Sequence, residues 1–294
     1  MKFIKGLLKR LLGLVIFLVI ICVLLLTGVQ AYGNTMLGID VFKTIGHVRT
    51  LTKEVDEANL CPNAFSADDM VDVEGIINSA VEDLIQVSPD GNYVVDFDNL
   101  PSEIKTEISL KEKQVGALAQ TLIQQEMQGE MELGGQELTI DLKQIDFTIV
   151  DSENTLVNVV IALDIAPLKE NLGKLDFLKT KIPNTIYISS TVNVKKEGNF
   201  GYKVTHNAFT VNSLNAEDTS DLFNTLNKLL KTGTVNKINE AIGQIVMDAL
   251  VGAPSGEEQG LARSLEEIGA TGYRFDVVDG ADCFIVEIEV DPLA

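Results

Sequence analysis

An uncharged apolar stretch near the N-terminus constrains this chain more than any other feature. Leu11 to Val29 contains 19 residues and no charge. As a helix it would extend about 28 Å at about 1.5 Å per residue, close to the roughly 30 Å hydrocarbon core of a bilayer. The charges that precede it are all positive: Lys2, Lys5, Lys9 and Arg10. Because positively charged flanks remain in the cytoplasm, we expect one membrane span with the rest of the chain exported.

The same stretch also has features of a cleaved signal peptide. Val29-Gln30-Ala31 resembles the small-x-small site of signal peptidase. The apolar region of a signal peptide is typically about 7–15 residues, however, and this one is longer. We therefore favour a retained anchor, while cleavage after Ala31 stays open. Both alternatives place the remaining residues outside the cytoplasm, and the favoured retained anchor places the protein at the cell membrane.

The exported part is strongly acidic. Four of the chain's 23 Lys and Arg residues belong to the basic head, so 19 stand against 43 Asp and Glu in the rest, a formal charge of −24. Such a charge repels nucleic acid and anionic lipid head groups, so we expect no nucleic-acid partner. The acidic residues are interspersed with apolar ones and do not form a block, which is typical of a solvated acidic surface.

The chain divides into three parts. Residues 1–31 form the basic head and the anchor, and residues 32–102 form a helical juxtamembrane region. In that region Ser66 is a good N-cap, followed by apolar residues at helical spacing from Val73 to Leu84. Residues 103–294 form the extracytoplasmic domain.

The extracytoplasmic domain alternates strand and helix patterns. A strand over 104–110 leads into a helix over about 112–127, and four alternating strands follow over 139–150, 156–165, 186–194 and 200–211. The alternation slips by one residue between Leu142 and Ile145 and again near His206, which predicts two bulges. Two amphipathic helices and a hairpin that turns at Asp279-Gly280 complete the chain. This pattern predicts an α+β fold in which a strongly curved antiparallel sheet packs on amphipathic helices.

Two stretches resemble a known family. ISLKEKQVGALAQ, Ile108 to Gln120, and the hairpin region from Thr191 to Leu214 resemble the YpmS-like family of membrane-anchored extracytoplasmic proteins of Gram-positive bacteria. The layout is similar to that of tubular lipid-binding (TULIP-like) proteins, in which a curved sheet wraps a long helix and holds acyl chains. The resemblance implies a lipid-binding role and transfers no site residue. The juxtamembrane region, residues 32–102, is longer than in the family.

No motif in the chain indicates catalysis. The two histidines, His47 and His206, fit ordinary surface or half-buried positions better than a general base or ligand. No G-x-S-x-G occurs, and a metal site built of His and Cys would need more of either. The run Pro89 to Asn99 has oxygen ligands but departs from the EF-hand pattern, which leaves at most a weak Ca²⁺ contact. Outside the anchor only Cys61 and Cys283 remain, and whether they pair is open. We predict a protein that is not an enzyme and has no cofactor.

Two functions remain. The first is a binding protein that holds a lipid or another apolar ligand in a groove between sheet and helix. The residues predicted to line that groove are Val115, Leu118, Leu122, Phe147, Ile149, Val159, Ile161 and Leu163. The same residues would equally fill a dry core. The alternative function is a non-catalytic cell-envelope scaffold that binds a protein partner.

Overall fold

The computed structural model describes residues 41–82, 86–87, 93–94, 104–127, 132–133, 136–137, 139–164, 166, 183–230, 234–254, 260–266 and 269–290. Leu11–Val29 and the carboxylates of the Pro89–Asn99 run lie outside these residues. Within the described part of the chain, no helix is both long enough and apolar enough to cross a membrane.

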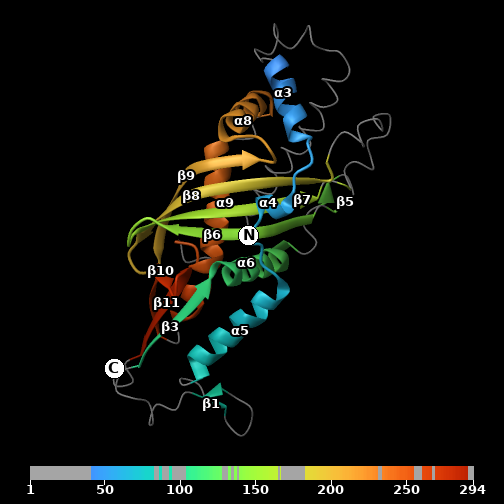
Figure 1. Ribbon diagram of the computed structural model, residues 1–294. Helices are drawn as coiled ribbons and strands as arrows, with labels where there is room; N and C mark the ends of the chain where they lie inside the picture. The colour runs from blue at the N-terminus through green and yellow to red at the C-terminus, as the bar shows by residue number, and fades with distance from the viewer. Residues whose placement is uncertain are drawn as a thin grey trace.

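Helices occur at both ends of the fold (Figure 1). The N-terminal region contains α3 (Val41–Leu51), α4 (Glu57–Leu60) and α5 (Ala67–Glu82). The later helices are α6 (Glu112–Met127), α8 (Ala216–Leu230), α9 (Val235–Leu250) and α10 (Leu261–Ser264). The predicted start of α5 is confirmed, because the Asp69 carboxylate accepts hydrogen bonds from both the N–H and the hydroxyl of Ser66.

Four long strands form an antiparallel meander in chain order: β6 (Thr139–Ile149), β7 (Asn154–Asp164), β8 (Thr185–Glu197) and β9 (Gly201–Val211). Both predicted bulges are present. The β6–β7 register shifts between Leu142 and Gln144, and the β8–β9 register shifts between Thr191 and Val192. Each bulge lets the apolar residues on either side of it face the same core, which is the reason the alternation slips in the sequence.

A second antiparallel sheet has the order β10–β11–β3, with β10 (Ala270–Val278), β11 (Ala281–Val290) and β3 (Ile104–Lys111). Asp279 and Gly280 both have positive φ, 52° and 79°, as the predicted two-residue hairpin turn requires. Two short pairs complete the strands: β1 (Gln86–Val87) with β2 (Tyr93–Val94), and β4 (Glu132–Leu133) with β5 (Gln136–Glu137).

The class of the fold, α+β with antiparallel sheets, is therefore as predicted, but the prediction of a single sheet is wrong. β3 pairs with the distant β11, whereas β6 begins a sheet of its own. Aromatic rings connect the two sheets, and the Phe147 ring of β6 lies edge-on to Phe275 of β10 with centroids 4.9 Å apart. Alternation fixes which side of a strand is buried, but it does not identify the neighbouring strand.

Helices α9 and α6 cover the apolar face and one edge of the four-stranded sheet. α9 lies across β8 and β9, and Gly243 allows its backbone to approach Val192 and Val204 closely. α6 runs along the edge strand β6, where Gln120 accepts a hydrogen bond from the Leu142 N–H at 2.7 Å and Glu112 accepts one from the Phe147 N–H at 2.6 Å. These side chains occupy backbone donors that an exposed edge would offer to another strand.

The segment Thr52–Ser66, here called the strap, covers part of the opposite face. Tyr187 of β8 alternates with the core residues Ile186 and Ile188, and its hydroxyl donates to Glu57 of the strap at 2.6 Å. The strap then passes the edge of β6, where the Asn63 N–H donates to the Gln144 side chain at 2.9 Å. It thereby delivers α5 to the side of the molecule where α6 and β3 lie.

Candidate functional site

The residues predicted to line an apolar groove lie in the packed core. Six of them have exposed fractions of 0–9%: Val115, Leu118, Phe147, Val159, Ile161 and Leu163. All six belong to one continuous cluster of buried apolar residues. Ile149 is half-buried, and the side chain of Leu122 lies outside the described part of the structure.

The fold brings the predicted helix and strand faces together, because α6 packs on β6. The space beside them is occupied by protein, including Ile242 and Val246 of α9 in the same cluster. Such low exposure of Val115 and Val159 means that neighbouring side chains cover them almost completely. These exposures agree with the alternative that the same residues fill a dry core.

Both histidines are held by nearby polar groups. His47 of α3 is buried, and its Nδ1 lies 3.6 Å from a carboxylate oxygen of Asp218. The Nδ1 atom of His206 lies 2.7 Å from the amide nitrogen of Asn239, within hydrogen-bond distance.

Asn239 is the centre of a buried polar cluster at the β8–β9 bulge. Its amide also donates to the Thr191 carbonyl at 2.7 Å, and its side-chain oxygen accepts from the Ser190 hydroxyl. Ser190 and Asn239 are both fully buried. The bulge interrupts the ladder at Thr191, so the Asn239 amide supplies a partner that the neighbouring strand does not. The hydroxyl of Ser190 is directed to Asn239, so this cluster stabilises the bulge.

Cys61 and Cys283 do not form a disulfide. Both are free and buried, Cys61 in the strap and Cys283 in β11. Burial raises the pKa of the Cys61 thiol to about 11, with a contribution from the nearby Glu57 carboxylate.

Among the described residues there is also no group of three or more His, Cys, Asp or Glu placed to hold a metal ion.

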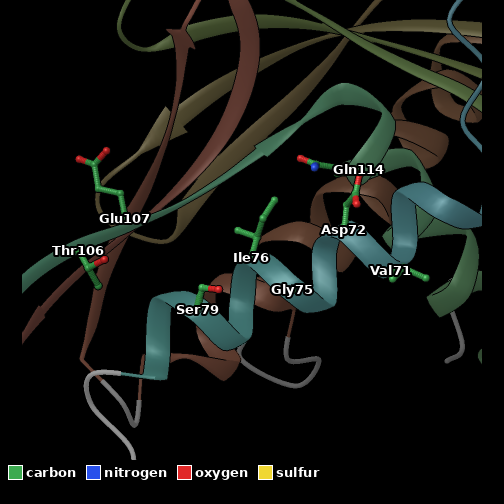
Figure 2. Close-up of a pocket in the computed structure, with 8 residues that line it drawn as sticks. All are labelled: Val71, Asp72, Gly75, Ile76, Ser79, Thr106, Glu107 and Gln114. Carbon is green, nitrogen blue, oxygen red and sulfur yellow. The ribbon is translucent and has the colours of Figure 1, made fainter.

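An open surface depression, here called the groove, lies between α5 and β3 (Figure 2). Its volume is about 600 Å³, within the usual range for ligand pockets. The lining residues come from α5, β3 and the first turn of α6: Val71, Asp72, Gly75, Ile76, Ser79, Thr106, Glu107 and Gln114. Ile76 points from α5 toward β3, and the side chains of Thr106 and Glu107 leave β3 in different directions (Figure 2).

The walls of the groove are fixed by ordinary packing. Val73 of α5 is fully buried, and Ile76 and Ile77 pack on the core. At the start of α5 the ring of Phe65 lies against Gly116 of α6, so closely that a Cβ at Gly116 would be 2.3 Å from it. α5 is therefore held at its N-terminal end and along its apolar face, while its other face borders the groove.

The surroundings of the groove are acidic. The sequence of α5, ADDMVDVEGIINSAVE, contains five acidic residues and no basic one. Beside the groove Arg274 of β10 donates to Glu107 at 2.9 Å and to Glu287 at 2.7 Å, and it lies 3.5 Å from Asp276. The hydrogen bond to Glu107, followed by the one to Glu287, raises the pKa of Arg274 above its usual value. One cation thus stands among three carboxylates, and the net charge is negative.

Sequence reasoning missed this groove. The feature of the sequence that relates to the groove is Gly75, a glycine in the middle of a helix. A Cβ at this position would meet no atom within 4 Å, so the helix leaves open space there. The groove has no nucleophile paired with a base, so its chemistry is that of recognition: exposed carboxylates, a small apolar area and the backbone of a strand.

Comparisons with known proteins give no relative. No family model matches the chain, and no curated protein and no solved structure matches it. The resemblance to the YpmS-like family stays a prediction from the two sequence stretches.

Proposed function

We propose that this chain is a non-catalytic cell-envelope protein, anchored by Leu11–Val29, whose extracytoplasmic body binds a protein partner. The observation that carries this proposal is the combination of a filled apolar core with an acidic groove beside a sheet edge. A protein partner needs an accessible surface, and the groove supplies one without any rearrangement of the core.

Tethering fits the way the N-terminal region joins the body. α3 ends at Leu51, and the Leu51 carbonyl accepts a hydrogen bond from the buried Asn212 amide at 2.8 Å. The Asn212 side-chain oxygen in turn accepts from the Tyr187 N–H at 2.7 Å. A partner bound to the body would therefore be held close to the bilayer by a short, well-connected segment.

Lipid binding is the second candidate, and the sheet–helix layout favours it. The four-stranded sheet has strands of 11–13 residues with two bulges, and the amphipathic helix α9 lies against it. Bulges increase twist and bending, so we propose that this sheet curves around α9 as in the TULIP-like layout. An acyl chain would then have to separate α6 and α9 from side chains such as Val159, which are packed in the ligand-free chain.

Two measurements test these proposals. Protease added to intact cells that lack an outer membrane should digest the body, and a body that is cut only after lysis would refute the topology. Native mass spectrometry of the detergent-extracted full chain should show a protein partner at fixed stoichiometry and no acyl species. If the extracted chain instead carries lipid at fixed stoichiometry and no protein partner, the function is lipid binding and the scaffold proposal is refuted.

A further inference from the structure

We propose that the groove between α5 and β3 receives a basic, extended segment of the partner protein, which pairs as an additional strand with the free edge of β3. This inference rests on the proposed function and specifies the chemistry of the partner. Three features of the described residues carry it: the unpaired edge, the shape of the groove and its charge.

Among the described strands, β3 is an edge strand. It pairs with β11 along its whole length, from Ile104↔Val290 to Lys111↔Cys283, and no other described strand lies on its other side. Within the described part of the chain, no backbone hydrogen bond joins β3 to any element other than β11. In an antiparallel strand alternate residues direct both backbone groups to the same side. About half of the N–H and C=O groups of β3 therefore point away from β11. At the end of the strand the Lys111 N–H donates to the Gln114 side-chain oxygen at 2.8 Å, so an added strand would pair with the residues before Lys111.

The groove opens on this free edge. Thr106 and Glu107 are consecutive, so their side chains lie on opposite faces of the sheet, as Figure 2 shows, yet both line the same groove. A space lined from both faces of a strand must border the edge between them. An added strand would lie about 4.8 Å from β3, on the side where the groove lies.

α5 forms the opposite wall and offers mainly small or apolar contacts. Gly75 leaves open space where a side chain would stand, and Val71 is 66% exposed although it is apolar. Alternate side chains of an added strand would contact Val71 and Ile76, while its backbone pairs with β3. In recognition by strand addition, backbone hydrogen bonds supply the affinity and side-chain contacts supply the specificity.

The negative charge of the groove favours a basic partner segment. Asp72 is the exposed carboxylate of the α5 wall, and Glu107 on the strand retains 51% of its side-chain exposure although it is paired with Arg274. The described residues that line the groove include no lysine or arginine. A basic segment would be attracted by both walls of the groove. A second copy of this chain would be repelled, because its own acidic surface would face the acidic groove. An anionic lipid head group would be repelled for the same reason.

The test uses the full chain in a non-ionic detergent and three labelled ten-residue peptides. The first peptide alternates Lys and Val, the second alternates Glu and Val, and the third is the Lys–Val peptide with its backbone N-methylated at every residue, so that neither of its edges can donate hydrogen bonds. Fluorescence anisotropy at physiological salt measures the Kd of each peptide. We expect binding of the Lys–Val peptide alone, because the second peptide has the wrong charge and the third cannot pair with β3.

Matched variants separate the groove from the general acidity of the chain. Asp72→Lys should weaken binding of the Lys–Val peptide about five- to tenfold, whereas Glu74→Lys, the same charge change at an exposed α5 position outside the groove, should change it less than about twofold. Gly75→Phe should fill the groove and abolish binding. Equal effects of Asp72→Lys and Glu74→Lys, equal binding of the N-methylated peptide, or no binding of any peptide would overturn the proposal.

Three further outcomes are informative. If the extracted chain retains its protein partner when Asp72→Lys and Gly75→Phe are combined, the groove is not the docking site, although the scaffold function stands. If the extracted chain carries no protein partner at all, the proposed function itself fails. Dimerisation of the wild-type chain that Gly75→Phe abolishes would identify a second copy as the occupant and would also overturn the proposal.

Discussion

The close approach of α9 to the four-stranded sheet makes a specific prediction about one glycine. A Cβ at Gly243 would lie 2.6 Å and 2.9 Å from the two Cγ atoms of Val192 and 2.9 Å from a Cγ atom of Val204. Carbon atoms in contact prefer about 3.5–4.0 Å. Val192 is fully buried and its branched side chain has little rotamer freedom, so the helix must move away from the sheet to accept a methyl group.

The magnitude follows from two opposing effects. Gly→Ala inside a helix ordinarily stabilises by about 1 kcal/mol. Overpacking a well-packed core costs about 1–3 kcal/mol, and three contacts this short favour the upper part of that range. We therefore expect Gly243→Ala to destabilise the chain by about 2 kcal/mol, which lowers Tm by about 4–8 °C in a body of this size.

Gly75 is a matched control, because it is also the ninth residue of a 16-residue helix. A Cβ at Gly75 meets nothing within 4 Å, so Gly75→Ala should raise Tm by about 2–4 °C. Thermal unfolding followed by circular dichroism measures both changes, since the chain has no Trp for fluorescence. Adding Val192→Ala to Gly243→Ala should cost less than the two single changes added together. A neutral Gly243→Ala variant, or strictly additive costs, would refute the reasoning.

Three further changes test other contacts. Gly116→Ala should displace the Phe65 ring, lower Tm and accelerate protease cleavage in the strap, and Phe65→Ala should abolish this sensitivity to Gly116→Ala; unchanged cleavage would contradict the contact. Asn239→Ala should cost about 2–4 kcal/mol because it leaves buried groups at the bulge without partners, whereas Asn236→Ala, exposed on the same helix, should cost little in the same unfolding assay. Burial raises the pKa of Glu112, so the stability it contributes is lost as pH rises through that pKa. Glu112→Gln should therefore raise Tm at pH 7 and match the wild type near about pH 4, and an equal gap at both pH values would count against this account.

Much of the fold could be predicted because local patterns report burial directly. The strict alternation from Val157 to Leu163 predicted β7, and the Asp279-Gly280 pair predicted a turn with two positive φ angles. The slip between Leu142 and Ile145 predicted a bulge, because a one-residue shift would otherwise turn Ile145 and Phe147 out of the core.

The arrangement of the strands could not be predicted in the same way. Ile108 alternates like any half-buried strand residue, and nothing in its neighbourhood in the sequence identifies Val286 as its partner. The strap was missed for a related reason: Gln144 and Asn63 resemble solvent-exposed polar residues, and only the fold shows that they bond to each other. Pairing between distant segments is a property of the assembled chain.

The predicted apolar groove illustrates a further limit of sequence patterns. An apolar stripe such as Val115 and Leu118 on a helix is the same whether a ligand or another helix covers it. What covers it is decided by residues elsewhere, here α9, whose own stripe includes Ile242 and Val246. The groove at β3, by contrast, depends on an open position at Gly75, and a single glycine is weak information in a sequence.

The strap and α5 are part of the folded body. A body cut at the sequence boundary of 102 and 103 would lose α5, and with it one whole wall of the groove. It would also uncover Gly116 of α6, which Phe65 now covers, and the face of the sheet beneath the strap. The free edge of β3 would then be exposed without the acidic helix beside it, and bare edges pair indiscriminately. If a partner segment pairs with β3 as proposed, α5 restricts which segment can reach that edge.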